Sequence, residues 1–218
     1  MVKDLRTNTS VQNYISFEGL EGCGKTFYLK YLRQRNPSFF ILLDEELSDF
    51  GVSLFHVLKK RDGFFRSTQP LREFLGFSMI DLDQIHTCVL PALAHKKVVL
   101  QDRGADTTCL YAAIQLSEQE KRPLQEVFHR LFSLRSQFGP VPSHVLLILD
   151  DFRTCIERAE QRNGKRYTSE EHTFLQKIDA GFRALVSWYP QRIVTVDRTG
   201  KSVHDMVLLL EKKISTFL

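Results

Sequence analysis

The stretch Phe17-Glu18-Gly19-Leu20-Glu21-Gly22-Cys23-Gly24-Lys25-Thr26-Phe27, FEGLEGCGKTF, indicates the fold class because its flanks give the pattern G-x-x-x-x-G-K-T a structural context. The segment NYISFE before the glycines has the length and composition of a buried strand, and KTFYLKYLRQR after them has the pattern of a helix. A glycine-rich turn that opens a helix directs backbone N–H groups, and the positive end of the helix dipole, at phosphate oxygens. The stretch therefore predicts a phosphate-binding loop, which we call the phosphate loop (residues 19–26), rather than an incidental glycine-rich turn.

Each side chain of the phosphate loop has a chemical reason to be there. Lys25 is predicted to neutralise the β- and γ-phosphates of ATP, and the Thr26 hydroxyl is predicted to hold Mg²⁺. ATP and Mg²⁺ are the expected cofactors. The predicted nucleotide-binding residues are Gly19, Gly22, Cys23, Gly24, Lys25, Thr26 and Phe27.

Short apolar runs alternate with longer helical patterns along the rest of the chain. Strands are predicted over 14–17, 39–43, 97–100, 144–149 and 192–196, and helices over 25–34, 71–94, 122–137, 152–162, 169–188 and 202–216. This alternation predicts parallel strands joined by right-handed helical crossovers. We expect an α/β fold of the P-loop NTPase class, with three α/β/α layers, a five-stranded parallel sheet and one domain over residues 1–218.

Composition places the chain among ordinary globular proteins. Its 218 residues carry 30 Lys and Arg against 26 Asp and Glu, a net charge of +4, which is modest and suits small anionic ligands. The four cysteines form no C-x-x-C pair, which favours reduced thiols over a zinc site or disulfides. No secretion signal or membrane segment is predicted. We therefore expect a cytoplasmic protein whose partner is a small nucleotide, not nucleic acid or a membrane.

Several segments beyond the phosphate loop resemble the thymidylate kinase family of nucleoside monophosphate kinases, of which the chain is identified as a divergent member. The loop itself is similar to that family's F-E-G-x-[DE]-G-x-G-K-[ST]. The similarity covers nearly the whole chain and includes P-A-L at 91–93, Q-D-R-G-A-D-T-T-C-L-Y at 101–111, residues 144–162, F-L-Q-K-I-D-A-G-F at 174–182 and V-D at 196–197.

The resemblance implies roles for five residues in acceptor and metal binding. Glu21 is expected to bond the 3′-hydroxyl of a deoxyribose, Arg103 to grip the acceptor phosphate, and Thr107 to lie in the same site. Asp102 is expected to reach Mg²⁺ through water. For Asp102 and Arg103 the alternative is a buried structural salt bridge. Tyr111 is expected to crowd the sugar 2′-carbon, with plain core packing as the alternative.

A basic segment over 158–168 is expected to form a small lid over the site. The phosphate loop lacks the extra arginine found in one branch of the family, so the resemblance assigns the transition-state cation to Arg162 or Arg166. Together with Lys25 and Arg103, these arginines are the predicted catalytic residues. The alternative is a solvated basic surface.

The segment 43–48 departs from the family pattern. Where the family has R-E-P-G-G, this chain has L-D-E-E-L-S, so acids replace a cation. If Asp44 or Glu45 faces the site, it would repel a monophosphate and could act as general base towards a 5′-hydroxyl. Glu45 is counted among the predicted substrate residues. The alternative is that these acids face solvent or cap the next helix.

The predicted base pocket contains a second departure. Phe77 stands where the family stacks an aromatic ring on the base, although it could equally be a core residue. Asp81 stands where the family has an arginine that donates to thymine O4. An ionised acid cannot donate and instead suits an exocyclic amine or a ring N–H, so thymine specificity is in doubt.

These observations predict transfer of the ATP γ-phosphoryl group to a deoxynucleoside monophosphate, with the base uncertain. Two other functions stay open: a deoxynucleoside kinase that acts on the 5′-hydroxyl, and a nucleotide-binding module that has lost catalysis. The resemblance also allows a homodimer formed through the apolar helices predicted at 71–94 and 122–137.

Overall fold

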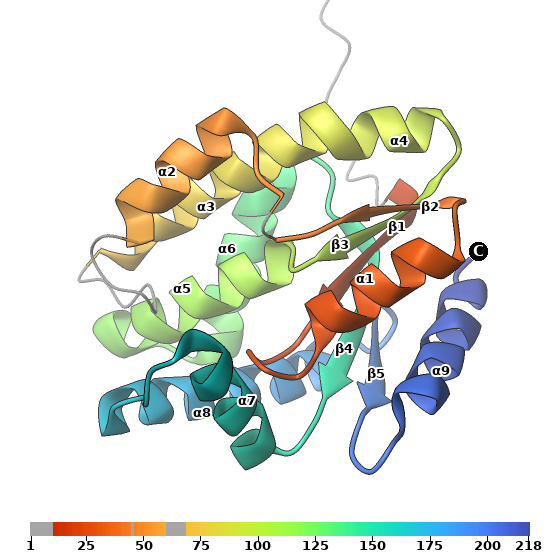
Figure 1. Cartoon of the computed structure of the whole chain (residues 1–218). Helices are drawn as coiled ribbons and strands as arrows, with labels where there is room; N and C mark the ends of the chain where they lie inside the picture. Colours follow the sequence, from red (N-terminus) through yellow and green to blue (C-terminus); the bar gives the residue numbers. More distant parts are fainter. Residues whose placement is uncertain (1–10, 45, 60–68) are drawn as a thin grey trace, which may run out of the picture.

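The structure, a computed structural model, describes residues 11–44, 46–59 and 69–218. Its centre is a five-stranded sheet with the order β2-β3-β1-β4-β5 (Figure 1). Every neighbouring pair is parallel, which confirms the predicted sheet. The strands are β1 (Val11–Glu18), β2 (Phe39–Leu42), β3 (Val98–Asp102), β4 (Pro142–Leu149) and β5 (Ile193–Asp197).

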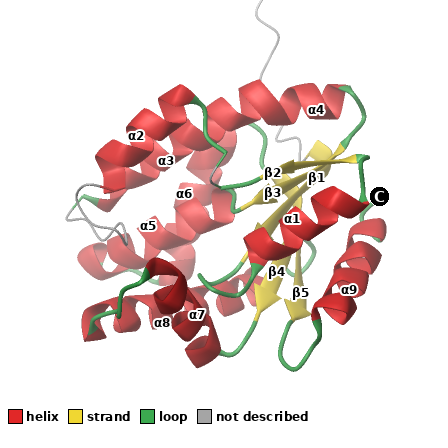
Figure 2. Ribbon diagram, viewed as in Figure 1, coloured by secondary structure: helices red, strands yellow, loops and turns green. Residues whose placement is uncertain are grey.

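Helices cover both faces of this sheet (Figure 2). Helices α1 and α9 contact each other, while α4 packs against β3 and α8 against β5. Helices α2 and α3 pair beside the sheet, and α5 packs between α3, α6 and α8. The helices are α1 (Lys25–Arg35), α2 (Asp49–Lys59), α3 (Pro70–Gln84), α4 (Leu90–Ala94), α5 (Ala105–Glu120), α6 (Leu124–Phe138), α7 (Phe152–Asn163), α8 (Ser169–Trp188) and α9 (Val203–Ser215).

The predicted helix over 71–94 is interrupted by a π-helical turn, η1 (Ile85–Val89). Pro91 follows this turn and has no N–H to donate to the carbonyl four residues earlier, so the normal helical ladder cannot continue through it. A π-turn inside a helix often lies near a functional site. Here it follows directly on the end of α3 that carries Asp81 and Gln84.

Two helices, α2 and α5, were not predicted as helices. Helix α5 buries side chains around much of its circumference, including Cys109, Leu110, Ala112 and Ala113, because it packs between three other helices. A helix buried on several sides shows no single apolar stripe. The apolar residues of α5 therefore have no periodicity that predicts a helix, and residues 101–111 are recognised only as a motif.

The core lies on both sides of the sheet, as expected for parallel strands covered by helices. Residues 145–148 of β4 are at most 1% exposed, as are Ile15 and Phe17 of β1. Because both faces of these strands are buried, the sequence shows them as short apolar runs. Within the described ranges, no helix is long and apolar enough to cross a membrane.

Candidate active site

A cavity of about 730 Å³ opens beside the carboxyl ends of β1 and β3. Ligands of open parallel sheets bind at this edge, because the loops that follow the strands converge there. The cavity wall combines segments far apart in sequence: the phosphate loop, α3, α5 and the end of α7. The predicted residues that line it are Glu21, Gly22, Gly24, Lys25, Thr26, Phe27, Phe77, Asp81, Arg103, Thr107, Tyr111 and Arg162.

The phosphate loop is shaped for an anion. Gly24 adopts a left-handed conformation at the start of α1, and no side chain of the described residues caps that helix end, which leaves its first N–H groups directed outwards. The Lys25 ammonium donates to the carbonyl oxygens of Gly19 (2.9 Å) and Leu20 (3.0 Å), so the loop curls around it. Cys23 and Gly19 do not line the cavity but support the loop from behind, Cys23 fully buried and Gly19 against Ile148.

Gly22→Ala is expected to distort the phosphate loop and weaken ATP binding at least tenfold. Its φ is +80°, and a Cβ would lie 2.0 Å from the Cys155 carbonyl oxygen, a backbone atom that cannot yield without moving α7. Clash and strain together should also cost about 1–3 kcal/mol of folding stability. Calorimetry with ATP and thermal unfolding would measure both effects.

Gly200→Ala is the matched control for this prediction. Gly200 also has a positive φ, +69°, but no described heavy atom lies within 4 Å of the point that an added Cβ would occupy. It should show the backbone strain alone and keep its affinity for ATP. Equal ATP affinity in the two variants would contradict the role given to the tight contact at Gly22.

Thr26 and Asp102 present oxygen atoms suited to a hard divalent cation. The Thr26 hydroxyl donates to Asp102 Oδ2 at 2.5 Å, while Asp102 Oδ1 is buried and has no hydrogen-bond partner among the described residues. The described residues contain no cluster of three or more His, Cys, Asp or Glu side chains that could hold a metal alone. One carboxylate and one hydroxyl fit Mg²⁺, which keeps waters and takes further oxygens from phosphate groups.

Arg103 is a half-buried cation that faces the cavity. Its backbone is left-handed, with φ 61°, directly after β3. Its Nη1 atom is buried and has no hydrogen-bond partner among the described residues, and Nε lies 3.6 Å from Asp44 Oδ2. Burial opposes the charge, but Tyr111, Asp44 and Asp102 outweigh it and raise the pKa of Arg103 above its ordinary value. Arg103 thus stays charged, with unused hydrogen-bonding capacity towards an anion.

The acids after β2 take different directions. Asp44 approaches Arg103, as described, and also lines the cavity. Glu46 turns away instead and accepts hydrogen bonds from Arg33 of α1, which lowers the pKa of this carboxyl. Glu45 lies outside the described residues. Of the two described acids in this segment, Asp44 therefore belongs to the cavity wall and Glu46 to the molecular surface.

Aromatic rings form one side of the cavity. Phe77 of α3 is half-buried and meets Phe55 of α2 edge to face, with ring centroids 6.3 Å apart. Tyr111 of α5 packs edge to face on Phe174, and burial raises the pKa of its hydroxyl, so Tyr111 stays protonated. Phe77 and Tyr111 contribute to the cavity wall as well as to packing, which makes both available to a flat ligand.

Glu18 is a buried acid that sequence reasoning did not single out. It accepts hydrogen bonds from the backbone N–H of Gly104 (2.9 Å) and from the Thr107 hydroxyl. Burial, together with the nearby charge of Asp106, raises the pKa of Glu18 to about 8. Glu18 therefore braces the turn that carries Arg103. Its place at the end of β1, next to the glycines, is the signal that could have found it.

The lid is tied to the phosphate loop. Arg162 and Asn163 both donate to Glu21 Oε1, the latter at 3.1 Å. Arg158 also lines the cavity and donates to Asp150 at 2.7 Å. Arg166 does not line it: its side chain is 88% exposed and donates to Glu160. The structure thus brings Arg162 to the predicted site and leaves Arg166 outside it.

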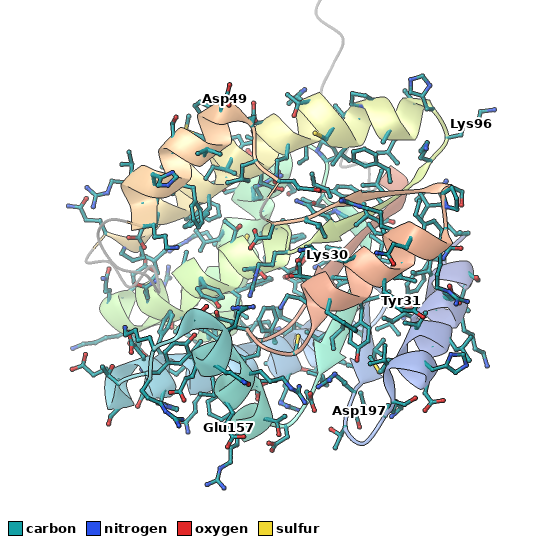
Figure 3. The ribbon with its side chains drawn as sticks, viewed as in Figure 1. Lys30, Tyr31, Asp49, Lys96, Glu157 and Asp197 are labelled. Carbon is teal, nitrogen blue, oxygen red and sulfur yellow. The ribbon has the colours of Figure 1, made fainter. Side chains whose placement is uncertain are left out.

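Two further cavity residues lack a strong sequence signal. Lys30, labelled on α1 in Figure 3, lines the cavity one helical turn after Thr26. Gln101, the last residue before Asp102, lines it beside Asp81 and is 3% exposed. Helical spacing from Thr26 could have found Lys30. Gln101 could be found only by knowing which face of β3 meets α3.

A five-stranded parallel sheet, an uncapped glycine loop with a buried lysine, and a hydroxyl–carboxylate pair define a phosphotransferase of the P-loop class. The family model described as thymidylate kinase matches residues 17–208, and the chain belongs to the thymidylate kinase family.

Named relatives match over almost their whole length. A thymidylate kinase of Thermoanaerobacter sp. (strain X514) is 26% identical over 208 residues, which cover 92% of this chain and 97% of the relative. One of Geobacter sp. (strain M21) is 28% identical over 216 residues, covering 92% and 90%. The crystal structure of thymidylate kinase from Ehrlichia chaffeensis matches with a TM-score of 0.64 and 19% identity, covering 92% and 97%. The last comparison shows the shared fold.

Proposed function

We propose that the protein transfers the γ-phosphoryl group of ATP to a deoxynucleoside monophosphate, and that residues 1–218 work as one kinase domain with its lid at 158–168. The observation that carries this proposal is the half-buried guanidinium of Arg103: its Nη1 atom is buried and has no hydrogen-bond partner among the described residues, and it faces a cavity that also contains Lys25. A cation with such an unpaired N–H suits an acceptor that carries its own phosphate. The relatives named thymidylate kinase make thymidylate the reference acceptor.

The phosphate loop would bind ATP, the phosphoryl donor. Its backbone N–H groups and Lys25 would hold the β- and γ-phosphates of ATP. Thr26 and Asp102 would hold Mg²⁺, which neutralises charge on the phosphate oxygens when bound. Phosphoryl transfer needs little covalent help from a protein, so fixing the two phosphates in line supplies most of the catalysis.

Arg103 and the residues around it would bind the acceptor monophosphate. Arg103 would grip the acceptor phosphate, with Thr107 and Tyr111 placing the sugar. Glu21 would bond the 3′-hydroxyl, which would compete with Arg162 and Asn163 for this carboxylate. The released Arg162 could then turn to the transferring phosphoryl group, so acceptor binding and lid rearrangement would be linked. The exposed Arg166 would need a larger lid movement to do the same.

A second candidate function, a deoxynucleoside kinase, is favoured by Asp44 beside Arg103. A carboxylate there could take the proton of a 5′-hydroxyl. An ADP-release assay over deoxynucleosides and their monophosphates separates the functions. Turnover of monophosphates alone supports our proposal, and turnover of nucleosides alone supports the second candidate. ATP binding without any turnover would leave only a nucleotide-binding module.

Asp44→Asn is expected to lower the KM for the acceptor monophosphate by about two- to fivefold. The substitution removes a negative charge near the phosphate, and the effect is small because Asp44 is 59% exposed and screened by water. Asp49→Asn on α2, outside the cavity wall, is the matched control (Figure 3). A loss of turnover of a hundredfold or more in Asp44→Asn, with nucleosides as acceptor, would instead identify Asp44 as a general base.

The homodimer stays a prediction. Leu71, Leu75 and Met79 are each at least 40% exposed and follow one another at four-residue spacing on α3. Such a stripe is one that a second copy could bury. Sedimentation equilibrium would test it.

A further inference from the structure

Four polar side chains from four different elements meet at the floor of the cavity. Asp81 comes from α3, Gln101 from β3, Arg135 from α6 and Tyr14 from β1. Asp81 and Gln101 line the cavity, whereas Arg135 and Tyr14 are fully buried behind them. The family resemblance does not account for this group, since it places an arginine, not an acid, at position 81.

The hydrogen bonds of this group run in one direction. Arg135 donates from both Nε (3.0 Å) and Nη2 to Asp81 Oδ2. Gln101 Nε2 donates to Asp81 Oδ1 at 3.1 Å, and Tyr14 donates its hydroxyl to Gln101 Oε1. Burial raises the pKa of Tyr14 well above its ordinary value, so this hydroxyl keeps its proton. Because an ionised carboxylate can only accept, the Gln101 amide must present its nitrogen to Asp81.

This arrangement leaves one acceptor and one donor for a ligand. A carboxylate has about four lone-pair positions, of which Arg135 and Gln101 occupy three, so among the described residues Asp81 Oδ1 keeps one. The Gln101 amide has two N–H groups and uses one of them within the same part of the chain. The free lone pair and the free N–H lie side by side, on atoms 3.1 Å apart, in a cavity wall that also contains Phe77.

Adjacent acceptor and donor groups match the edge of an amino base. In cytosine and adenine an exocyclic N–H, which donates, stands beside a ring nitrogen, which accepts. On the other side of the amine these bases carry only a carbon-bound hydrogen or a more distant atom. In thymine the single N–H lies between two carbonyl oxygens. If it bonded Asp81, one carbonyl could accept from Gln101, but the other would face the carboxylate and repel it.

We propose that Asp81 and Gln101 bind the edge of the acceptor base and select a base with an exocyclic amine, such as cytosine or adenine, over thymine, while Arg135 and Tyr14 are positioning residues. This inference rests on the proposed function and narrows its acceptor. Arg135 does not touch the base. It bonds Asp81 Oδ2 and so turns Oδ1 towards Gln101, while Tyr14 donates to the amide oxygen of Gln101.

The test compares kcat/KM for dCMP, dAMP and dTMP at saturating ATP. Wild-type protein should use dCMP or dAMP at least tenfold better than dTMP. Asp81→Asn keeps the shape of the side chain but reverses the pattern: the new amide oxygen faces Arg135, its nitrogen faces Gln101, and the Gln101 amide must turn over. The cavity floor would then present a donor at position 81, which matches thymine O4, and an acceptor at position 101, which matches thymine N3–H.

Asp81→Asn should therefore lower the ratio of amino-base to thymine kcat/KM by roughly 10²-fold, because unpaired polar groups in a buried site discriminate strongly. Asp83→Asn, two residues along α3 and bonded to Ser48 outside the cavity wall, should leave the ratio unchanged. Arg135→Met could fail to fold, so the isosteric Asp81→Asn carries the test, with thermal unfolding as a check on its fold.

The outcomes distinguish this inference from the proposed function. If wild-type protein phosphorylates no monophosphate, the proposed function fails. If it phosphorylates monophosphates but prefers dTMP, or if Asp81→Asn leaves the base ratio at its wild-type value, the function stands and the base assignment is overturned. Calorimetric affinities for dCMP and dTMP, measured without ATP, give the same comparison independently of turnover.

Discussion

Lys25→Met is expected to lower kcat for phosphoryl transfer by about 10³-fold while the protein stays folded. Lys25 is the cation at the centre of the phosphate loop, 5% exposed and anchored to the carbonyl oxygens of Gly19 and Leu20. From there it can follow the charge that develops on the transferred group. Removing one such preorganised donor from a water-poor site costs about 10²–10³-fold in rate, and a full positive charge lies at the upper end.

Single-turnover kinetics with radiolabelled ATP would measure this loss separately from ATP binding. Lys212→Met on α9, an exposed lysine away from the cavity, is the matched control and should keep wild-type kcat. Circular dichroism should show unchanged helix content in both variants. Activity of Lys25→Met within tenfold of wild type would rule out the phosphate loop as the donor site.

Arg103→Met is expected to lower kcat/KM for the acceptor monophosphate by about 10²–10³-fold and to leave the Kd for ATP within a factor of about two. Truncating one partner of a buried charged contact costs roughly 2–5 kcal/mol, which corresponds to that range. The loss should appear in the kcat/KM for the acceptor, because Arg103 follows β3, whereas the proposed site of the ATP phosphates is the loop after β1.

Arg103→Lys sharpens this prediction. It keeps a positive charge but not the planar fork, so it should recover only part of the lost kcat/KM. Arg130→Met, which removes a half-exposed arginine paired with Glu120 on the surface, is the control. An unchanged acceptor KM in Arg103→Met would falsify the assignment of Arg103 to the acceptor phosphate and would favour a nucleoside as the substrate.

Most of the secondary structure could be predicted because its causes are local. The phosphate loop is recognised from its glycines and its flanking strand and helix. Helix α8 has the predicted bounds, 169–188, and begins with a capping box in which Thr168 and Glu171 bond each other's backbone N–H groups. Strands buried on both faces are recognised in the sequence as short apolar runs. Each of these signals lies within a few neighbouring residues, so no knowledge of the tertiary fold is needed.

The partners of the site's charged groups could not be predicted in the same way. Glu21 meets Arg162, 141 residues later, and Asp81 meets Arg135, 54 residues later. The sequence indicated an isolated acid at position 81 and an available carboxylate at position 21. The structure shows that both already hold an arginine, which changes what each can offer to a ligand.

Glycine spacing, apolar runs and motif order were enough to predict the fold class, the phosphate loop and the family, because they are properties of the chain read in one direction. The folded chain was needed to establish which acid faces Arg103, which lid arginine reaches the cavity, and how Asp81 and Gln101 are oriented. These depend on where helices α3, α6 and α7 pack, and so on long-range contacts that set distance and burial. Distance and burial control the strength of charges and hydrogen bonds, which is why the proposed acceptor site depends on packing, whereas the phosphate loop could be predicted from the sequence.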